Sequence, residues 1–345
     1  MFMLLVSYNR FLPKHFRHNL ARLLWLAYIT ISSCSALLDD EGEIIGDNNK
    51  STSSNKPPIG MVLIRAGSCV MGSGVNQSVV AKTNITQMVT VGPFYMDEAP
   101  VTNAQYRKFI AIVQADPAAY GLDEAYINEK LMPDPTVWKR DFGFMFMDDS
   151  FGKSHWEDPR FDAHPVVGIT WEAAQQYARI RTIRRNKHLE AKGRPPGPSF
   201  RLPTEAEWER AAKGGKESGQ YPFGGPSVRD KKGNLLANFQ VTKGNYAASG
   251  YAYTSPVKAF PPNAYGLYDM AGNVYDWCAN VPSTLLIHKN ETISPFYKDE
   301  DGVFRVIKGG SWKDYSYALQ TGVSDYEHKD MARAYIGFRC VMSAI

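Results

Sequence analysis

The stretch R-V-I-K-G-G-S-W-K-D-Y-S-Y-A-L-Q-T-G, from Arg305 to Gly322, decides how this chain folds. Val303 to Ile307 favour a strand, because β-branched and aromatic side chains lie between turn signals. Gly309 and Gly310 then allow backbone angles closed to other residues and a close approach of neighbouring chain. The segment Y-I-G-F-R-C, Tyr335 to Cys340, completes the pattern. Large aromatic residues follow the glycine pair and must be buried or bound: Trp312, Tyr315 and Tyr317.

The composition is that of a soluble globular protein. The 345 residues are 44% hydrophobic and 21% charged, which suits one large or two ordinary domains with a substantial core. The formal net charge is +4. The first 33 positions hold enough basic residues to account for all of that charge, and they contain no acid. A nearly neutral mature chain gives no reason to expect a nucleic-acid partner.

Residues 1–33 have the features of a signal peptide. Basic residues precede an apolar run from Leu23 to Ile31 that is shorter than the roughly 20 residues of a membrane-spanning helix. The following I-S-S-C, Ile31 to Cys34, resembles a bacterial lipobox, so Cys34 is predicted to become the lipidated first residue of the mature protein. Two alternatives remain open: an uncleaved signal anchor, and an ordinary signal peptide with an incidental cysteine.

The rest of the chain divides into a tether and one domain. Residues 34–58 are polar and poor in apolar side chains, which predicts a flexible, lipid-anchored tether. The acids from Asp39 to Glu43 leave a sorting signal as an alternative. The globular domain is predicted over residues 59–345. Within it, residues 114–160 have no clear period and are rich in aromatic residues, Pro and Asp, so we expect a long, partly ordered insertion.

The remaining cysteines, Cys69, Cys278 and Cys340, do not make a disulfide framework. They allow at most one disulfide, and buried thiols are the favoured state. The chain has no C-x-x-C, and the globular domain has no histidine pair at zinc-ligand spacing. The sequence therefore supports neither a structural zinc site nor a zinc-hydrolase motif.

Two capping boxes predict where helices begin. Thr102 is followed by Gln105 three residues later, and Thr204 is followed by Glu207 in the same way. Glu205 and Glu209 share one face of the second helix. We assign these glutamates to structure rather than to carboxylate catalysis.

A third helix is predicted from Trp171 to about His188, capped by Thr170 and preceded by a buried strand from Val166 to Ile169. Its second half is basic and contains Arg179, Arg181, Arg184, Arg185 and Lys187. A solvated face is the favoured interpretation, with help from the helix dipole. An acidic partner surface is the alternative, and it makes partner-binding candidates of Arg181, Arg184 and Arg185.

Several motifs occur together in a fixed order: F-R-L-P-T-E-A-E-W-E, N-x-Y-G-L-Y-D-M-A-G-N-V-x-D-W, K-G-G-S-W and G-F-R-C. Over roughly residues 58–345 the chain resembles the formylglycine-generating, sulfatase-modifying-factor domain family. That resemblance implies an α+β fold with little regular secondary structure, topologically related to C-type lectins.

Within that family, three segments resemble the GldK/PorK lipoproteins of gliding motility and type IX secretion in Bacteroidetes. They are residues 308–322, residues 326–340, and Y-P-F-G-G-P with N-L-L-A-N-F in residues 221–239. The resemblance implies a structural subunit anchored in the outer membrane and facing the periplasm, which forms a ring with a GldN/PorN-type partner. A GldJ-type lipoprotein and a lectin-like ligand-binding lipoprotein are the alternatives.

The same resemblance argues against enzyme activity. The oxidase of this family needs two thiols, which bind copper and carry the redox chemistry. The matching positions here are Asp314 and Leu319, so we expect no formylglycine formation and no copper. Ser311, Asp314, His328 and Asp330 could be drawn as a hydrolytic set, but no nucleophile motif or spacing supports it.

Calcium is the cofactor that the resemblance implies. The first site would use the Asp269 and Asp276 side chains with the carbonyls of Gly272 and Val274. A hydrogen-bonded turn, with both carboxylates capping backbone amides, is the alternative. A second, weaker site would match Asn238, Phe239, Ser249 and Tyr251, where serine replaces an acid. For Trp312, Tyr315 and Tyr317, core packing and a partner-binding surface both remain open.

Overall fold

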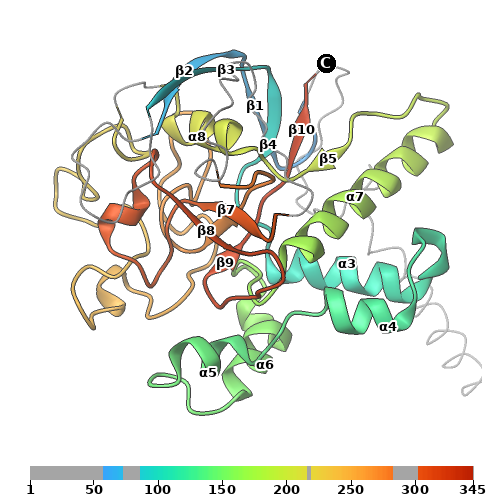
Figure 1. The fold of residues 1–345 in the computed structure, drawn as a ribbon, viewed down its shortest axis with the longest axis horizontal. Coiled ribbons are helices and arrows are strands. Elements are labelled where there is room, and N and C mark those ends of the chain that lie inside the picture. The colour runs from blue at the N-terminus through green and yellow to red at the C-terminus, as the bar shows by residue number, and fades with distance from the viewer. Residues whose placement is uncertain (1–56, 73–85, 216–218, 283–301, 345) are drawn as a thin grey trace, which may run out of the picture.

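The computed structural model describes residues 57–72, 86–215, 219–282 and 302–344. Figure 1 shows short strands in the middle and upper part of the molecule, with most helices along one side and below and one short helix among the upper strands. Much of the chain between these elements is irregular, so the prediction of a mixed fold with little regular structure is confirmed. The predicted signal peptide, Cys34 and the acids from Asp39 to Glu43 lie outside the described residues.

The first sheet joins the two ends of the domain. Its strands lie in the order β1 (Met61–Ile64), β4 (Phe94–Asp97), β10 (Val341–Ser343) and β5 (Phe200–Arg201), and all neighbours are antiparallel. The predicted strand at Met61 to Ile64 is confirmed. A separate antiparallel pair, β2 (Gly67–Met71) and β3 (Gln87–Val91), packs against α8 (Glu205–Lys213) through buried apolar residues that include Val89 and Trp208.

The second four-stranded sheet lies at the centre of the molecule. Its order is β8 (Ser324–His328), β7 (Phe304–Lys308), β6 (Tyr275–Trp277) and β9 (Ile336–Gly337), with β6 and β9 parallel. At the terminal strand β8, the amides of Tyr326 and His328 donate to the carboxylates of Asp325 at 2.8 Å and Glu327 at 2.9 Å. Side chains therefore satisfy backbone donors along this edge.

Two long helices form the largest apolar cluster with the sheets. They are α3 (Asn103–Ala115) and α7 (Trp171–Ala191), which meet where Tyr106 stacks on Tyr177 at 5.9 Å and both rings contact Phe338. Both predicted capping boxes are present, at the N-termini of α3 and α8. The cysteines of the domain, Cys69, Cys278 and Cys340, are buried as thiols.

Residues 114–160 differ from the sequence-based expectation. Instead of a partly ordered loop they form short helices: η1 (Ala118–Tyr120), α4 (Glu124–Tyr126), η2 (Ile127–Leu131), α5 (Val137–Phe142) and α6 (Ser150–Glu157), followed by η3 (Pro159–Phe161). Asp123 caps α4 through its side chain, and Ile127, Leu131, Val137 and Trp138 are buried. Each helix is too short to show a period, so its burial comes from tertiary contacts.

The predicted strand at Val166 to Ile169 is wrong. These residues are buried, but none of them belongs to a strand: the isolated bridge beside them joins Thr102 to Pro165, and the segment itself runs as irregular chain. Further short elements are η4 (Ala247–Ser249) and η6 (Ser316–Leu319). None of the helices in the described ranges combines the length and apolar character needed to cross a membrane.

Two buried histidines share one hydroxyl group between α6 and the loop before α7. His155 Nε2 and His164 Nδ1 each lie 2.9 Å from Thr254 Oγ1, so the hydroxyl donates to one ring and accepts from the other. Burial lowers the pKa of His155 to about 3, and the charges of His164 and Arg107 add to that effect. Burial also lowers the pKa of His164 to about 4.

We expect acid to destabilise the protein through these histidines. Their unfolded pKa is about 6.5, so the unfolded chain binds more protons and stability falls as pH drops from about 6.5 toward 4, by roughly 1.4 kcal/mol per pH unit for each ring. The raised pKa of Asp269, about 6, acts in the opposite direction. Urea unfolding of the wild type and of His164→Gln at about pH 7 and pH 5 isolates one ring. An equal loss of stability in both proteins would contradict the assignment.

Candidate functional site

The turn after β7 depends on two glycines with positive φ, 103° at Gly309 and 69° at Gly310. A Cβ added to Gly310 would lie 2.8 Å from Leu319 Cδ1 and 3.0 Å from the Ala318 carbonyl. A Cβ on Gly309 would lie 3.1 Å from Trp208. The close approach predicted from the Gly-Gly pair is therefore confirmed, and it brings the chain back against η6.

Trp312 belongs to the core and not to a partner surface. Its side chain is fully buried, stacks on Trp138 at 5.9 Å and contacts Phe142 at 4.5 Å. Its Nε1 donates to the Ala334 carbonyl at 3.2 Å. The prediction that Trp312 contacts a partner is therefore wrong, because helix α5 of the insertion covers its ring. Tyr315 is exposed and Tyr317 is half-buried, so only these two of the three aromatics reach the surface.

Asp314 and Leu319 both have structural contacts. The Asp314 carboxylate accepts hydrogen bonds from the Ser311 hydroxyl and from the Ser311 amide at 3.1 Å, which closes the turn. Leu319 is fully buried in an apolar cluster with Tyr221, Phe239 and Ala271. One position thus shapes the turn and the other fills the core, so neither projects a reactive group into solvent.

Lys313 lies beside this turn, next to one carboxylate and two tyrosine rings. Its Nζ lies 2.6 Å from Asp314 Oδ1, 4.3 Å from the Tyr335 ring centre and 5.9 Å from the Tyr275 ring centre. Burial raises the pKa of Tyr275 well above its ordinary value, and the charges of Asp314 and Asp325 raise it further. Burial also raises the pKa of Asp325, while Lys313 lowers it.

The four residues considered as a hydrolytic set divide into two pairs. Ser311 binds Asp314, whereas His328 Nδ1 faces Asp330 Oδ2 at 3.7 Å. Asp314 also pairs with Lys313, so its charge is already compensated. Ser311 has no histidine base among its hydrogen-bond partners, and this geometry gives no support to nucleophilic catalysis.

The first predicted calcium site is held by protein hydrogen bonds. Asp269 Oδ2 accepts from the Lys258 amide at 2.8 Å. Asp276 Oδ2 accepts from Trp208 Nε1 at 2.8 Å and from Arg339 Nε at 2.7 Å. Burial raises the pKa of both carboxyls, to about 6 for Asp269.

Arg339 brings to this loop the positive charge that a cation would supply. Besides Asp276 it donates to the Asp269 carbonyl at 3.1 Å, and its side chain is fully buried. Gly272 lies tightly against the Asn238 backbone, and Val274 packs in an apolar cluster. The described residues contain no group of three or more His, Cys, Asp or Glu that could hold a metal ion. Protein groups thus already bind one oxygen of each carboxylate, Asp276 Oδ1 is left without a partner among the described residues, and calcium at the first site stays a prediction.

The residues of the second predicted calcium site lie close together, but no carboxylate is among them. Ser249 Oγ donates to Asn238 Oδ1 at 2.6 Å and lies 3.4 Å from the Tyr251 carbonyl. Phe239 is buried beside Leu319. A neutral set of oxygen atoms is a weak ligand for a divalent cation, so calcium here stays a prediction and adds nothing to the function proposed below.

For Arg181, the prediction that it contacts a partner is wrong. It is fully buried, pairs with Asp97 at 2.9 Å and covers the Phe200 ring at 4.0 Å. It lies on the inward face of α7 with Tyr177 and Ala178, four and three residues away. Because arginine is charged, the sequence pattern did not place it on that face. Arg185 also leans on Phe200, at 5.5 Å. Arg184 Nη1 donates to the Tyr120 hydroxyl at 2.9 Å.

A buried charge network that the sequence patterns did not predict lies beneath the turn. Lys308 Nζ lies 3.2 Å from Glu209 Oε2, and Lys213 Nζ lies 2.9 Å from Glu209 Oε1. Glu205 completes it through Ser324. The structural use predicted for Glu205 and Glu209 is confirmed. The lysine of the K-G-G-S-W motif was the available signal, because a lysine on a buried strand needs an acidic partner.

Residues 47–344 match the family model described as "Sulfatase-modifying factor enzyme 1-like domain". The chain belongs to this family. It is 29% identical over 302 residues to the formylglycine-generating enzyme of Streptomyces coelicolor, which covers 83% of this chain and 90% of that enzyme. It is also 32% identical over 281 residues to the mouse protein "Inactive C-alpha-formylglycine-generating enzyme 2", covering 74% of this chain and 77% of that protein.

Another family relative is much longer. The serine/threonine-protein kinase pkn1 of Chlamydia pneumoniae is 32% identical over 282 residues, which are 81% of this chain and 37% of the kinase. The chain thus spans little more than a third of that protein. Among solved structures, PvdO from Pseudomonas aeruginosa matches with a TM-score of 0.56 at 23% identity, covering 82% of this chain and 94% of PvdO. This likeness confirms the predicted fold class of the family.

Proposed function

We propose that this chain is a non-catalytic member of the sulfatase-modifying-factor family that works as a structural subunit. The observation that carries the proposal is the chemistry at Asp314 and Leu319. A carboxylate that closes a turn and a leucine buried in the core stand where the oxidase would need two thiols. Neither side chain can exchange disulfides, and leucine cannot ligate copper.

The finer identity that we propose is a GldK/PorK-type lipoprotein of gliding motility and type IX secretion. Its support is the resemblance of residues 308–322 and 326–340, together with the lipobox that ends at Cys34. On this proposal the lipid on Cys34 anchors the protein in the outer membrane, and the domain faces the periplasm. There it builds a ring with a GldN/PorN-type protein.

Assembly is tested on the full lipidated chain. We expect it to co-purify with a GldN/PorN-type protein from membranes of cells that express both, and the complex to elute far larger than one copy of each chain. A Cys34→Ala variant should lose the membrane fraction because the acyl chains are absent. Recovery of the lipidated chain as a lone monomer in the presence of that partner would overturn the proposed role.

Loss of catalysis is tested separately. We expect no aldehyde when the purified chain is incubated with copper, oxygen and a cysteine-containing sulfatase peptide, because Asp314 and Leu319 take the positions of the two thiols that would bind the metal. The readout is the mass change of the peptide. The Streptomyces coelicolor enzyme, assayed in parallel, is the positive control for substrate and copper. Conversion above the level of copper alone would contradict the proposal.

A further inference from the structure

A pocket of about 220 Å³ lies between strand β2 and the C-terminal end of α8, which are neighbours in Figure 1. Two cationic side chains of the helix line it, Arg210 and Lys213, and their spacing of three residues places them on one face. Tyr265 lines it from the loop that precedes β6. No carboxylate occurs among the described residues of this lining. The pocket therefore presents cations and a phenol hydroxyl to whatever enters it.

Arg210 is fixed in place without using all of its donors. Its Nε and Nη2 donate to the Arg65 carbonyl at 3.1 and 2.8 Å, and its Nη1 donates to the Ser68 carbonyl at 3.2 Å. A guanidinium has more N–H groups than these bonds use, so some remain for a ligand. Both partners are neutral carbonyls, so among the described residues no carboxylate pairs with this charge.

Lys213 adds a buried ammonium to the same pocket. Its side chain is 7% exposed, and its Nζ lies 2.9 Å from Glu209 Oε1. Glu209 also pairs with Lys308, and Glu205 lies 4.0 Å from that second lysine. The two carboxylates therefore balance the two lysines. The excess positive charge of this cluster rests on Arg210, where the pocket opens.

Two glycines bring backbone close to the donor groups of the pocket. A Cβ on Gly67 would lie 2.5 Å from Arg210 Nη2, and a Cβ on Gly215 would lie 3.1 Å from Tyr265 Oη. Gly215 also has a positive φ of 76°, which favours glycine. Within the described chain the Tyr265 hydroxyl has no hydrogen-bond partner. A side chain at either glycine would fill the space beside these donors.

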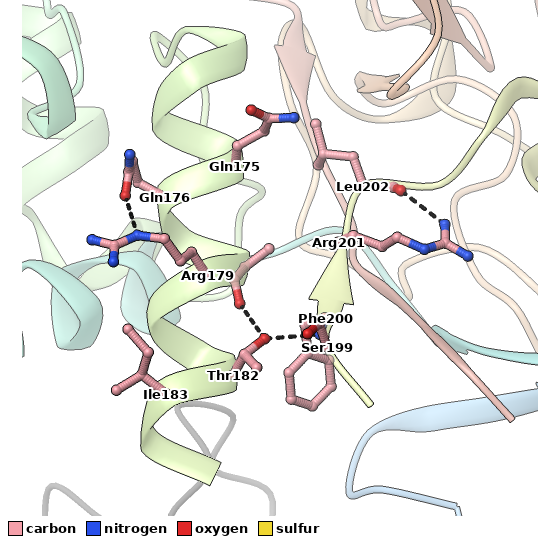
Figure 2. Close-up of a pocket in the computed structure, with 10 residues that line it drawn as sticks. Gln175, Gln176, Arg179, Thr182, Ile183, Ser199, Phe200, Arg201 and Leu202 are labelled. Carbon is pink, nitrogen blue, oxygen red and sulfur yellow. Dashed lines mark hydrogen bonds between the residues drawn. The ribbon is translucent and has the colours of Figure 1, made fainter. Parts of the chain in front are cut away.

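The larger groove between α7 and β5, of about 350 Å³, lacks this arrangement. Figure 2 shows its two arginines on the outer sides of the helix and the strand, with Arg179 bonded to Gln176 and Arg201 directed toward the Leu202 carbonyl. Arg201 also makes two 2.7 Å contacts with Glu207. The charges at that groove therefore point away from its interior, whereas those of the smaller pocket line it.

We propose that the pocket between β2 and α8 binds a phosphate group, carried either by a small phosphate monoester or by a lipid headgroup. Arg210 supplies charge and N–H donors, Lys213 adds its ammonium, and the Tyr265 hydroxyl donates from the facing loop. A phosphate group has three strong acceptor oxygens, enough for all of these side chains at once, whereas a carboxylate has only two. The inference goes beyond the structural role proposed above and does not depend on it.

The test follows thermal unfolding of the full chain in rising concentrations of inorganic phosphate, with sodium chloride holding the ionic strength constant. A ligand that binds the folded state raises the midpoint, and the concentration dependence of the rise gives a dissociation constant. We expect Arg210→Gln to weaken binding by about tenfold or more, because it removes the unmatched charge. Arg229→Gln is the matched control and should change affinity less than about twofold. Arg229 is exposed and likewise donates to a backbone carbonyl, that of Gly233.

Tyr265→Phe keeps every charge and the ring, and removes one donor. It should weaken phosphate binding by roughly three- to tenfold, the effect of one hydrogen bond. Its midpoint without phosphate should match that of the wild type, because the hydroxyl has no partner in the described chain. This variant carries the test if Arg210→Gln does not fold, and unchanged phosphate affinity in Tyr265→Phe would remove the hydroxyl from the site.

Two further ligands distinguish the sources of the phosphate: glycerol 3-phosphate, and phosphatidylcholine vesicles with and without phosphatidic acid. The vesicle experiment uses a Cys34→Ala background, so that no acyl chain on the protein contributes. Tighter Arg210-dependent binding to the phosphatidic acid vesicles identifies a lipid headgroup, and tighter binding of the soluble ester identifies a small molecule. The inference is overturned if neither inorganic phosphate nor these vesicles bind in a way that depends on Arg210, or if acetate binds as tightly as phosphate.

Discussion

Replacing Arg339 with leucine should destabilise the domain by about 3–5 kcal/mol, because it leaves the buried Asp276 carboxylate without its charge partner. Arg339 and Asp276 are almost completely inaccessible to solvent, and their contact is 2.7 Å long. The other Asp276 oxygen, Oδ1, has no hydrogen-bond partner among the described residues. Urea unfolding at neutral pH measures the loss, with the change in midpoint converted through a common slope.

Arg160→Leu is the matched control for this experiment. Arg160 pairs with Asp158 at 2.6 Å, but its side chain is 81% exposed. A surface pair of this kind contributes at most about 1 kcal/mol. If the two leucine variants lose similar stability, the buried pair of Arg339 with Asp276 contributes no more to folding than a surface ion pair.

Gly272→Ala should cost about 3–5 kcal/mol, through a backbone clash added to a strained backbone angle. Gly272 has φ of 72°. A Cβ there would lie 2.3 Å from the Asn238 carbonyl oxygen. The same residue donates from its amide to the Gly309 carbonyl at 2.9 Å, so any shift moves the turn after β7 as well. Thermal and urea unfolding report the change.

Gly266→Ala separates the two causes. Gly266 also has positive φ, 88°, but a Cβ there would meet no atom within 4 Å. Only the backbone strain should appear, at about 1 kcal/mol. The difference between the two alanine variants then measures the contact with Asn238. Equal losses would mean that the chain around Gly272 relaxes freely and that the tight approach has little energetic weight.

Features set by neighbours in sequence were predictable. The capping boxes at Thr102 and Thr204 depend on residues three positions apart, and the turn at Gly309 depends on backbone freedom alone. The structural use of Glu209 also followed from helical spacing. In each case the physical cause lies within one or two turns of chain, where local pattern is informative.

Features set by distant partners were not predictable. The sequence pattern favours a solvated position for Arg181, because it does not show that Asp97, on β4, is its partner. The sequence predicts Asp276 as a cation ligand, because it does not show that Arg339, near the C-terminus, pairs with this carboxylate. The helices of residues 114–160 are too short for their pattern to show. The pairing of these charges depends on tertiary contacts that no spacing rule contains.

The acid-capped edge at β8 limits how copies of this domain can associate. A neighbouring strand would have to displace Asp325 and Glu327 from the Tyr326 and His328 amides before it gained a ladder of hydrogen bonds. That barrier disfavours open-ended polymerisation of the domain through this sheet. Growth by strand exchange is thereby disfavoured, and association is left to surfaces with their own specificity.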